Sequence, residues 1–218
     1  MADNYTHRSP ERKAPTVTNL APLLERNQRF AATNARQHAP RLPFLPRAGL
    51  FIVCCMDCRV DPEEYLGLEF GEALIARNTG GRITPAVIQD IAYAGYLVDT
   101  KAPDGPYFEV AIIHHTDCGS RLLEDEQLRH GFAERGGYDE QMLAALPVTD
   151  PAETVRADVE RLLAAPQISV HTRVSGHVYD VDTGLVTTVV NSTDGRTEHQ
   201  PQAAPPDRSP TEAVTAQA

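Results

Sequence analysis

Short apolar runs alternate with helix-start signals along the middle of the chain, and this alternation limits the possible folds more than any other feature. Residues 50–55, 73–77 and 107–115 are runs of the kind that form strands buried on both faces of a sheet. Strands that alternate with helices are typical of βαβ units, in which neighbouring strands run parallel. We therefore expect an α/β fold, with a single domain built on a mostly parallel central sheet flanked by helices.

Three similar motifs mark the expected helix starts. Asp61, Thr84 and Asp150 each precede a proline, which combines an N-cap side chain with a residue suited to the first helical turn. The helix after Thr84 is expected to extend to about residue 98. The helix after Asp150 would face the sheet with Val155, Val159, Leu162 and Leu163.

The remaining elements are predicted from periodicity and turn residues. Residues 20–39 carry an apolar stripe at helical spacing, and another helix is expected from about Gly119. Residues 172–180 and 185–190 have the pattern of a β-hairpin whose turn lies at residues 182–184.

The two ends of the chain differ in composition from its middle. Residues 1–16 are rich in Arg, Pro and Asn, and the chain from about residue 191 is rich in Pro, Ala, Thr and Gln. Neither segment has the periodicity of a helix or a strand, so both are predicted to be disordered. The sequence thus predicts a disordered leader at residues 1–16, a catalytic domain at residues 17–190 and a disordered tail at residues 191–218.

The charge of the chain bears on its partners. Its formal net charge is -10, and its Lys and Arg residues form no run. Such an acidic surface repels phosphate backbones, which argues against nucleic-acid binding. No run is apolar enough to span a bilayer, and the polar start lacks the apolar segment of a secretory signal. We therefore expect a soluble, cytoplasmic protein with no membrane partner.

The cysteines are unevenly placed. Cys54, Cys55 and Cys58 fall within five positions, and Cys118 is the fourth cysteine of the chain. Such clustering does not suit a disulfide framework. In a cytosolic chain it more often indicates metal or redox chemistry.

Two reactive clusters follow expected strands. Cys55 ends the first apolar run, and His115 ends the third, with Cys118 three positions further on. The carboxyl ends of parallel strands meet at one edge of a sheet, where ligands bind. Zinc prefers thiolate and imidazole ligands, and a catalytic zinc keeps three protein ligands and one open position. We therefore expect Cys55, His115 and Cys118 to hold a zinc ion.

Asp57 and Arg59 alternate with Cys55. In an extended segment, side chains at alternating positions point to the same side. The arginine would keep the carboxylate ionised and fix its orientation, so that it can accept a hydrogen bond beside the metal. Alternatively, the pair is an ordinary salt bridge at the end of a strand.

Cys58 leaves two other interpretations open. As a fourth ligand, it would complete a closed Cys3His site, and the protein would be a non-catalytic zinc-binding module. As a redox partner of Cys55, it would form a thioredoxin-like dithiol. Strand alternation, which turns Cys58 away from Cys55, argues against the closed site.

The sequence resembles the beta-class carbonic anhydrases. The pattern Cys55-x-Asp57-x-Arg59 is followed about sixty residues later by His115-x-x-Cys118-Gly119, as in that family. Further similar segments lie at residues 77–82, 114–119 and 176–184, and the resemblance covers roughly residues 20–190. Cys58 and Thr79 depart from the family pattern, and the chain has no Trp on which to build the bicarbonate-regulatory site of some members.

The resemblance implies a fold, a metal and a reaction. It implies a parallel sheet flanked by helices, zinc held by Cys55, His115 and Cys118, and an Asp57–Arg59 pair that orients the attacking hydroxide. The implied reaction is the reversible hydration of carbon dioxide to bicarbonate by a homodimer or homotetramer, with the N-terminal helix reaching across the partner. The branch that the chain resembles also contains carbonyl sulfide and carbon disulfide hydrolases, so hydrolysis of those substrates at the same site is the alternative.

Overall fold

The computed structural model describes residues 19–38, 41–42, 44–102 and 108–194. The chain divides into two compact units, residues 1–42 and residues 43–218. None of the described helices is both long and apolar enough to cross a membrane. The predicted leader and most of the predicted tail lie outside the described residues.

The first unit contains two helices, α1 (Ala21–Ala32) and α2 (Ala35–His38). The sequence predicted one continuous helix over residues 20–39, which is wrong. Asn34 has a φ of 54°, a left-handed backbone that an α-helix cannot contain. The Thr33 hydroxyl donates to the Phe30 carbonyl at 2.6 Å and so satisfies a terminal acceptor of α1. No residue of α1 is buried.

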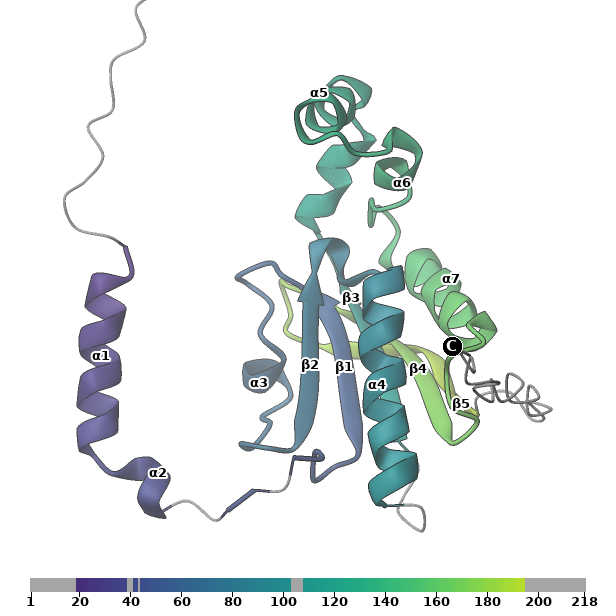
Figure 1. Ribbon diagram of the computed structural model, residues 1–218. Coiled ribbons are helices and arrows are strands. Elements are labelled where there is room, and N and C mark those ends of the chain that lie inside the picture. Colours follow the sequence, from purple (N-terminus) through teal and green to yellow (C-terminus); the bar gives the residue numbers. More distant parts are fainter. Residues whose placement is uncertain (1–18, 39–40, 43, 103–107, 195–218) are drawn as a thin grey trace, which may run out of the picture. The chain divides into compact units, whose positions relative to one another are not determined.

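The second unit is built on a five-stranded sheet with the order β2-β1-β3-β4-β5 (Figure 1). The first four strands in this order pair in parallel, and β5 pairs antiparallel to β4. The mostly parallel sheet predicted from the alternation is therefore confirmed. The strands are β1 (Leu50–Cys55), β2 (Ala73–Asn78), β3 (Phe108–His115), β4 (Thr172–Tyr179) and β5 (Val186–Asp194).

The predicted hairpin is formed by β4 and β5. Its turn is held by Asp180, whose Oδ1 accepts hydrogen bonds from the Asp182 and Thr183 amides at 3.0 and 2.8 Å. Gly184 adopts a left-handed φ of 73°, which glycine does without strain. The second strand continues to Asp194, beyond the predicted end at residue 190.

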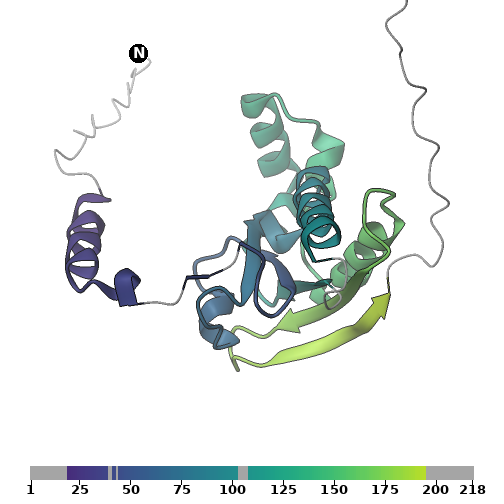
Figure 2. The same ribbon diagram turned by 60° about the horizontal axis from the view of Figure 1, so that its bottom comes forward.

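Helices α4 (Pro85–Lys101) and α7 (Pro151–Ala164) cover one face of the sheet (Figure 2). The predicted caps are present: the Thr84 side chain accepts from the Val87 amide, and Asp150 accepts from two amides of α7. Apolar side chains of both helices form the main core with the strands. This core includes Phe51, Val53, Val87, Ile91, Val110, Ile112, Val155, Val159 and Leu162.

The opposite face of the sheet is covered more thinly. Helix α3 (Pro62–Tyr65) is a single turn, capped by Asp61 as predicted. Tyr65 and Leu68 pack over a smaller cluster that contains Cys54, which is 1% exposed. Cys54 is therefore a core thiol.

Short helices lie beyond the carboxyl ends of the parallel strands (Figure 1). The helix expected from Gly119 is a 3-10 helix, η2 (Gly119–Glu124). A new helix then starts because Asp125 caps it through the Leu128 amide at 3.0 Å. The remaining helices are η1 (Thr79–Gly81), α5 (Glu126–Gly136) and α6 (Glu140–Ala144).

A buried ion pair joins the segment after η1 to α7. Arg82 Nε donates to Asp158 Oδ2 at 2.6 Å and Arg82 Nη2 donates to Oδ1 at 3.2 Å. Asp158 is 0% exposed. Burial would raise the pKa of this carboxyl, but interactions with His114 and Arg82 outweigh burial and lower it to about 2. The folded protein therefore favours the ionised carboxylate.

We expect Asp158→Asn to lower the free energy of unfolding by about 3 kcal/mol at pH 7, because it leaves a buried guanidinium without its counter-charge. The pKa of Asp158 lies below its ordinary value of 3.8, so its stabilising contribution is present above pH 4 and is lost as the pH falls towards 2. The difference in free energy of unfolding between wild type and variant should therefore narrow by about 1 kcal/mol between pH 5 and pH 3. Urea unfolding at each pH measures this difference. A difference that does not change with pH would contradict the lowered pKa of Asp158.

Candidate metal centre

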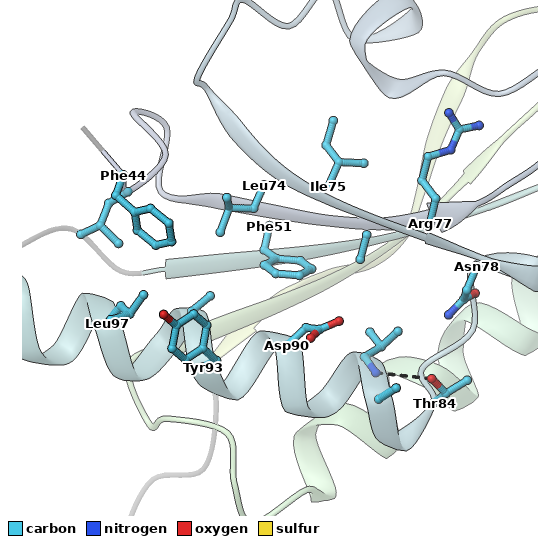
Figure 3. A pocket seen from close by; sticks show the side chains of 15 residues that line it. Phe44, Phe51, Leu74, Ile75, Arg77, Asn78, Thr84, Asp90, Tyr93 and Leu97 are labelled. Atoms are coloured by element: carbon cyan, nitrogen blue, oxygen red, sulfur yellow. Dashed lines mark hydrogen bonds between the residues drawn. The ribbon is translucent and has the colours of Figure 1, made fainter. Parts of the chain in front are cut away.

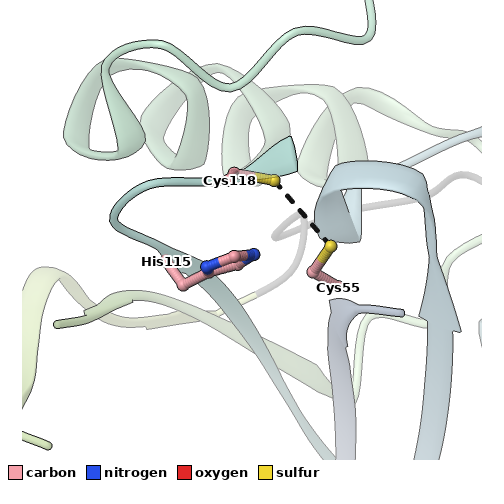
Figure 4. Close-up of side chains that lie close together, drawn as sticks. All are labelled: Cys55, His115 and Cys118. Atoms are coloured by element: carbon pink, nitrogen blue, oxygen red, sulfur yellow. Dashed lines mark hydrogen bonds between the residues drawn. The ribbon is translucent and has the colours of Figure 1, made fainter. Parts of the chain in front are cut away.

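Cys55 and His115 are the last residues of the neighbouring parallel strands β1 and β3. Cys118 lies at the start of η2, after a turn that follows β3. The three side chains converge (Figure 4), and their candidate ligand atoms all lie within 4.8 Å of one another. All three residues are buried. The group is therefore able to hold a metal ion.

The hydrogen bond of His115 determines which ring nitrogen faces the sulfurs. Its Nδ1 lies 2.8 Å from the Thr116 carbonyl oxygen, an acceptor, so Nδ1 carries the proton. Its Nε2 is buried and has no hydrogen-bond partner among the described residues. A buried nitrogen lone pair beside two sulfurs suits a metal ion, and a backbone carbonyl on the other nitrogen is a common way to orient such a ligand.

The two sulfurs lie close enough to share a hydrogen bond. Cys55 Sγ and Cys118 Sγ lie 3.8 Å apart. The hydrogen bond from Cys55 lowers the pKa of the Cys118 thiol, with help from His115 and Ser120 and against the effect of burial. The same hydrogen bond and burial raise the pKa of Cys55. Two thiolates and one neutral imidazole are a donor set that zinc prefers.

Asp57 and Arg59 form a close pair beside this group. Arg59 Nη2 donates to Asp57 Oδ2 at 2.7 Å and Nε donates to Oδ1 at 3.0 Å. The extended segment predicted here is wrong, because the Val60 amide bonds to the Asp57 carbonyl and closes a turn. The turn folds Arg59 back onto Asp57. The hydrogen bond from Arg59 lowers the pKa of Asp57 to about 2.

Asp117 holds Arg59 from the other side, a role that the sequence did not reveal. Arg59 Nη1 donates to Asp117 Oδ2, and Nη2 donates to the Asp117 carbonyl oxygen, both at 2.9 Å. Asp117 has a φ of 52°, a conformation that Asp adopts more readily than most residues. The guanidinium thus connects the segment after β1 to the turn between His115 and Cys118.

Arg77 anchors the same segment from β2. Its guanidinium donates to the carbonyl oxygens of Cys55, Asp57 and Val60 at 3.0, 2.7 and 2.8 Å. These carbonyls lie at or beyond the end of β1, where the sheet no longer supplies partners. Arg77 therefore fixes the backbone around Cys55.

A pocket of about 380 Å³ opens beside the metal group. Cys55, Asp57, Thr79 and Gly80 line one side of it. The rest of the wall is largely apolar and comes from η2 and α5, which the sequence did not assign to the site. The apolar residues that line the pocket are Met56, Leu122, Leu123, Leu128 and Phe132.

Comparisons with known proteins agree with this fold and geometry. A model of the carbonic anhydrase family matches residues 50–144. Beta-carbonic anhydrase 1 of Mycobacterium tuberculosis is 32% identical over 148 residues, which are 68% of this chain and 86% of the relative. The chain belongs to the beta-carbonic anhydrase family.

Other relatives include both a carbonic anhydrase and a carbon disulfide hydrolase. The crystal structure of a carbonic anhydrase from Streptococcus mutans is 32% identical, with a TM-score of 0.67, over 79% of this chain and 98% of that one. A carbon disulfide hydrolase of Acidianus is 29% identical over 157 residues, covering 62% of this chain and 74% of the relative.

Cys58 and His114 lie outside the metal group of this beta-carbonic anhydrase family member. Cys58 is exposed and is not part of the group formed by Cys55, His115 and Cys118. His114 is 0% exposed, and its Nδ1 lies 2.8 Å from the Thr154 hydroxyl. His114 is thus packed and hydrogen-bonded.

The paired glycines act as a turn and as a point of close approach. Gly80 and Gly81 have φ values of 77° and 67°. A Cβ on Gly81 would lie 2.8 Å from the Cys54 carbonyl carbon, whereas Gly80 lines the pocket. Asn78 closes this turn with its side-chain amide, which bonds to the Arg82 amide and carbonyl, both at 2.8 Å.

We expect Gly81→Ala to lower the free energy of unfolding by at least about 2 kcal/mol, because it combines a left-handed backbone with a clash against β1. Gly131→Ala is the matched control. Gly131 lies within α5, and a Cβ added there would meet no described heavy atom within 4 Å, so alanine should be neutral or stabilising by up to about 1 kcal/mol. Urea unfolding of both variants measures these changes. Equal free energies of unfolding for the two variants would contradict the expectation.

Proposed function

We propose that Cys55, His115 and Cys118 hold a zinc ion, and that the chain catalyses the reversible hydration of carbon dioxide to bicarbonate. The observation that carries the proposal is the buried Cys2His group, in which the Nε2 of His115 lacks a hydrogen-bond partner among the described residues. Three protein ligands beside an open pocket match a catalytic zinc site rather than a closed structural one. Membership of the beta-carbonic anhydrase family supports the same conclusion.

Asp57 and Arg59 supply the orientation that the reaction needs. When bound, zinc lowers the pKa of a water ligand to about 7, which makes hydroxide available near neutral pH. The pKa of Asp57 is about 2, so its carboxylate is ionised there and acts as a hydrogen-bond acceptor. Arg59, held by Asp57 and Asp117, keeps that carboxylate in one orientation. We propose that Asp57 orients the nucleophile and that Arg59 holds Asp57 in position.

The wall of the pocket suits a small substrate without charge. Leu122, Leu128 and Phe132 present apolar surface to the space next to Asp57 and Cys55. Carbon dioxide is linear and nonpolar, so it loses little hydration when it enters such a space. Bicarbonate is charged and is better solvated in water, which favours its release.

Hydrolysis of carbon disulfide, or of carbonyl sulfide, is the second candidate. Carbon disulfide hydrolases are among the relatives, and the apolar wall would accept the larger and less polar substrate equally well. The non-catalytic closed site receives less support, because Cys58 is exposed and lies outside the metal group.

We also propose that the chain assembles as a homodimer or homotetramer. Leu20, Leu23, Leu24 and Phe30 in and beside α1 are each about half exposed. Separately, the second unit has an apolar groove of about 510 Å³ between β2 and α4, with Phe44 and Tyr93 among its exposed lining residues (Figure 3). Contiguous exposed apolar surface of this kind marks interaction sites. We infer that a second copy covers both surfaces.

Stopped-flow hydration of carbon dioxide by zinc-quantified protein tests the proposed function. We expect about one zinc per chain and fast turnover, both lost in Cys118→Ser because the third ligand is gone. Cys58→Ser is the matched control, since it changes an exposed cysteine outside the metal group.

The controls separate the alternatives. Zinc and activity retained in Cys58→Ser exclude the closed site and the redox dithiol, whereas loss of zinc in that variant would favour the closed site. Stoichiometric zinc without hydration of carbon dioxide would contradict the proposed reaction. Release of hydrogen sulfide from carbon disulfide by the same protein would then identify the second candidate.

Light scattering coupled to size-exclusion chromatography tests the assembly. We expect a mass of two or four chains for wild type and a shift towards one chain for Leu24→Glu, because a buried charge opposes packing of the apolar stripe. Glu25→Gln, a change at the neighbouring position of the same helix, should leave the mass unchanged. A wild-type protein that elutes as a single chain would contradict the assembly.

A further inference from the structure

Ser120 lies directly behind one of the proposed zinc ligands. It is 6% exposed, and its Oγ lies 3.2 Å from the sulfur of Cys118. The Val148 amide donates to the same Oγ at 3.1 Å. An amide can only donate, so the serine oxygen is the acceptor in that bond. Its hydroxyl hydrogen is then left for the sulfur, since the Ser120 hydroxyl contacts only the Cys118 sulfur and the Val148 amide among the described residues.

The Val148 amide is held in turn by Arg82. Arg82 Nη1 donates to the carbonyl oxygens of Ala145 and Pro147 at 2.7 and 3.2 Å. The other two nitrogens of the Arg82 guanidinium donate to Asp158, so the guanidinium is held on both sides. The segment that carries Val148 therefore has little freedom to move away from Ser120.

Packing against Gly80 confines Ser120 on another side. A Cβ built on Gly80 would lie 3.1 Å from Ser120 Oγ and 3.1 Å from Val148 Cγ2. Such distances mean that the glycine backbone is already in close contact with both side chains. The hydroxyl is thus confined to the position from which it reaches the Cys118 sulfur.

The carboxylate that holds Arg82 also touches the strand that carries His115. His114 Nε2 lies 3.3 Å from Asp158 Oδ2, and the Ile83 amide donates to the same oxygen at 3.2 Å. One buried carboxylate therefore connects α7, the segment after η1 and the end of β3. Asp158 thus supports the end of the strand that carries His115 and, through Arg82, the segment next to Ser120 and Cys118.

We propose that Ser120 is a positioning residue for the metal site, which donates a hydrogen bond to the Cys118 sulfur and is itself held in place by the Arg82–Asp158 pair. The inference rests on the proposed zinc site. A hydrogen bond to a ligand thiolate fixes its orientation and withdraws some of its negative charge from the metal. Ser120 also lines the pocket beside the metal group, so the effect is sought in the affinity for the metal and in the metal–sulfur bond, which are measured without substrate.

Ser120→Ala removes the donor to the sulfur together with the acceptor of the Val148 amide, and Ser175→Ala, which also removes a buried hydroxyl, is the matched control. Ser175 is also buried, at 2% exposed, but its hydroxyl contacts Glu109 and His177 rather than a proposed ligand. We expect Ser120→Ala to bind zinc about 10- to 100-fold more weakly in competition with a chelator. In cobalt-substituted protein, the sulfur-to-metal charge-transfer band should shift. Ser175→Ala should change neither the affinity nor the band.

Two results would overturn the inference. The first is a Ser120→Ala variant, natively folded by circular dichroism, with wild-type zinc affinity and an unchanged cobalt band. The second is an equal change in Ser175→Ala, which would indicate a general effect of losing a buried hydroxyl. Wild-type protein that binds zinc but does not turn over substrate would refute the proposed reaction while leaving this test intact. Wild-type protein that binds no zinc would refute both proposals.

Discussion

The parallel pairing of β1 with β3 is the constraint on which the rest of the site depends. In the register of this pair, Cys54 lies opposite Ile113, so the two strands end within a residue or two of each other. Cys55 and His115 are their final residues, and they meet at one edge without any special loop. A shift of either strand by one residue would turn its ligand to the opposite face. Alternate residues of both strands pack into two different clusters, so such a shift would also exchange the side chains that fill each cluster.

Much of this architecture could be predicted from local patterns. Apolar runs predicted the strands, and the residue–proline pairs at Asp61, Thr84 and Asp150 predicted three helix starts, because both signals act over a few residues. Two local features were missed. The left-handed Asn34 breaks the first helix, and the Asp57 turn replaces an extended segment. Hydrophobic periodicity carries no information about either, because each depends on the backbone conformation at one residue.

The supports of the candidate site were harder to predict, because they pair residues far apart in the chain. Arg82 and Asp158 are 76 positions apart. Asp158 nevertheless left a signal: it lies among Val155, Val159 and Leu162 on the buried stripe of α7, where an unpaired charge is very costly. A carboxylate in that position implies a buried cation, although the sequence does not say which one. Ser120 left no such signal, because a serine after a turn is ordinary.

Three arginines supply hydrogen-bond donors beyond the ends of the strands. Backbone groups within β1 and β3 find partners in neighbouring strands, but beyond the strand ends that ladder is lost, and buried carbonyls need other donors. Arg77 supplies them to the segment after β1, Arg59 to Asp117 in the turn after β3, and Arg82 to the segment before α7. Each guanidinium offers five donors in a rigid plane, so a single side chain can hold several carbonyls and a carboxylate together. Lysine, with its flexible stem and a single nitrogen, could not replace them, and the loops around the metal group would lose their fixed positions.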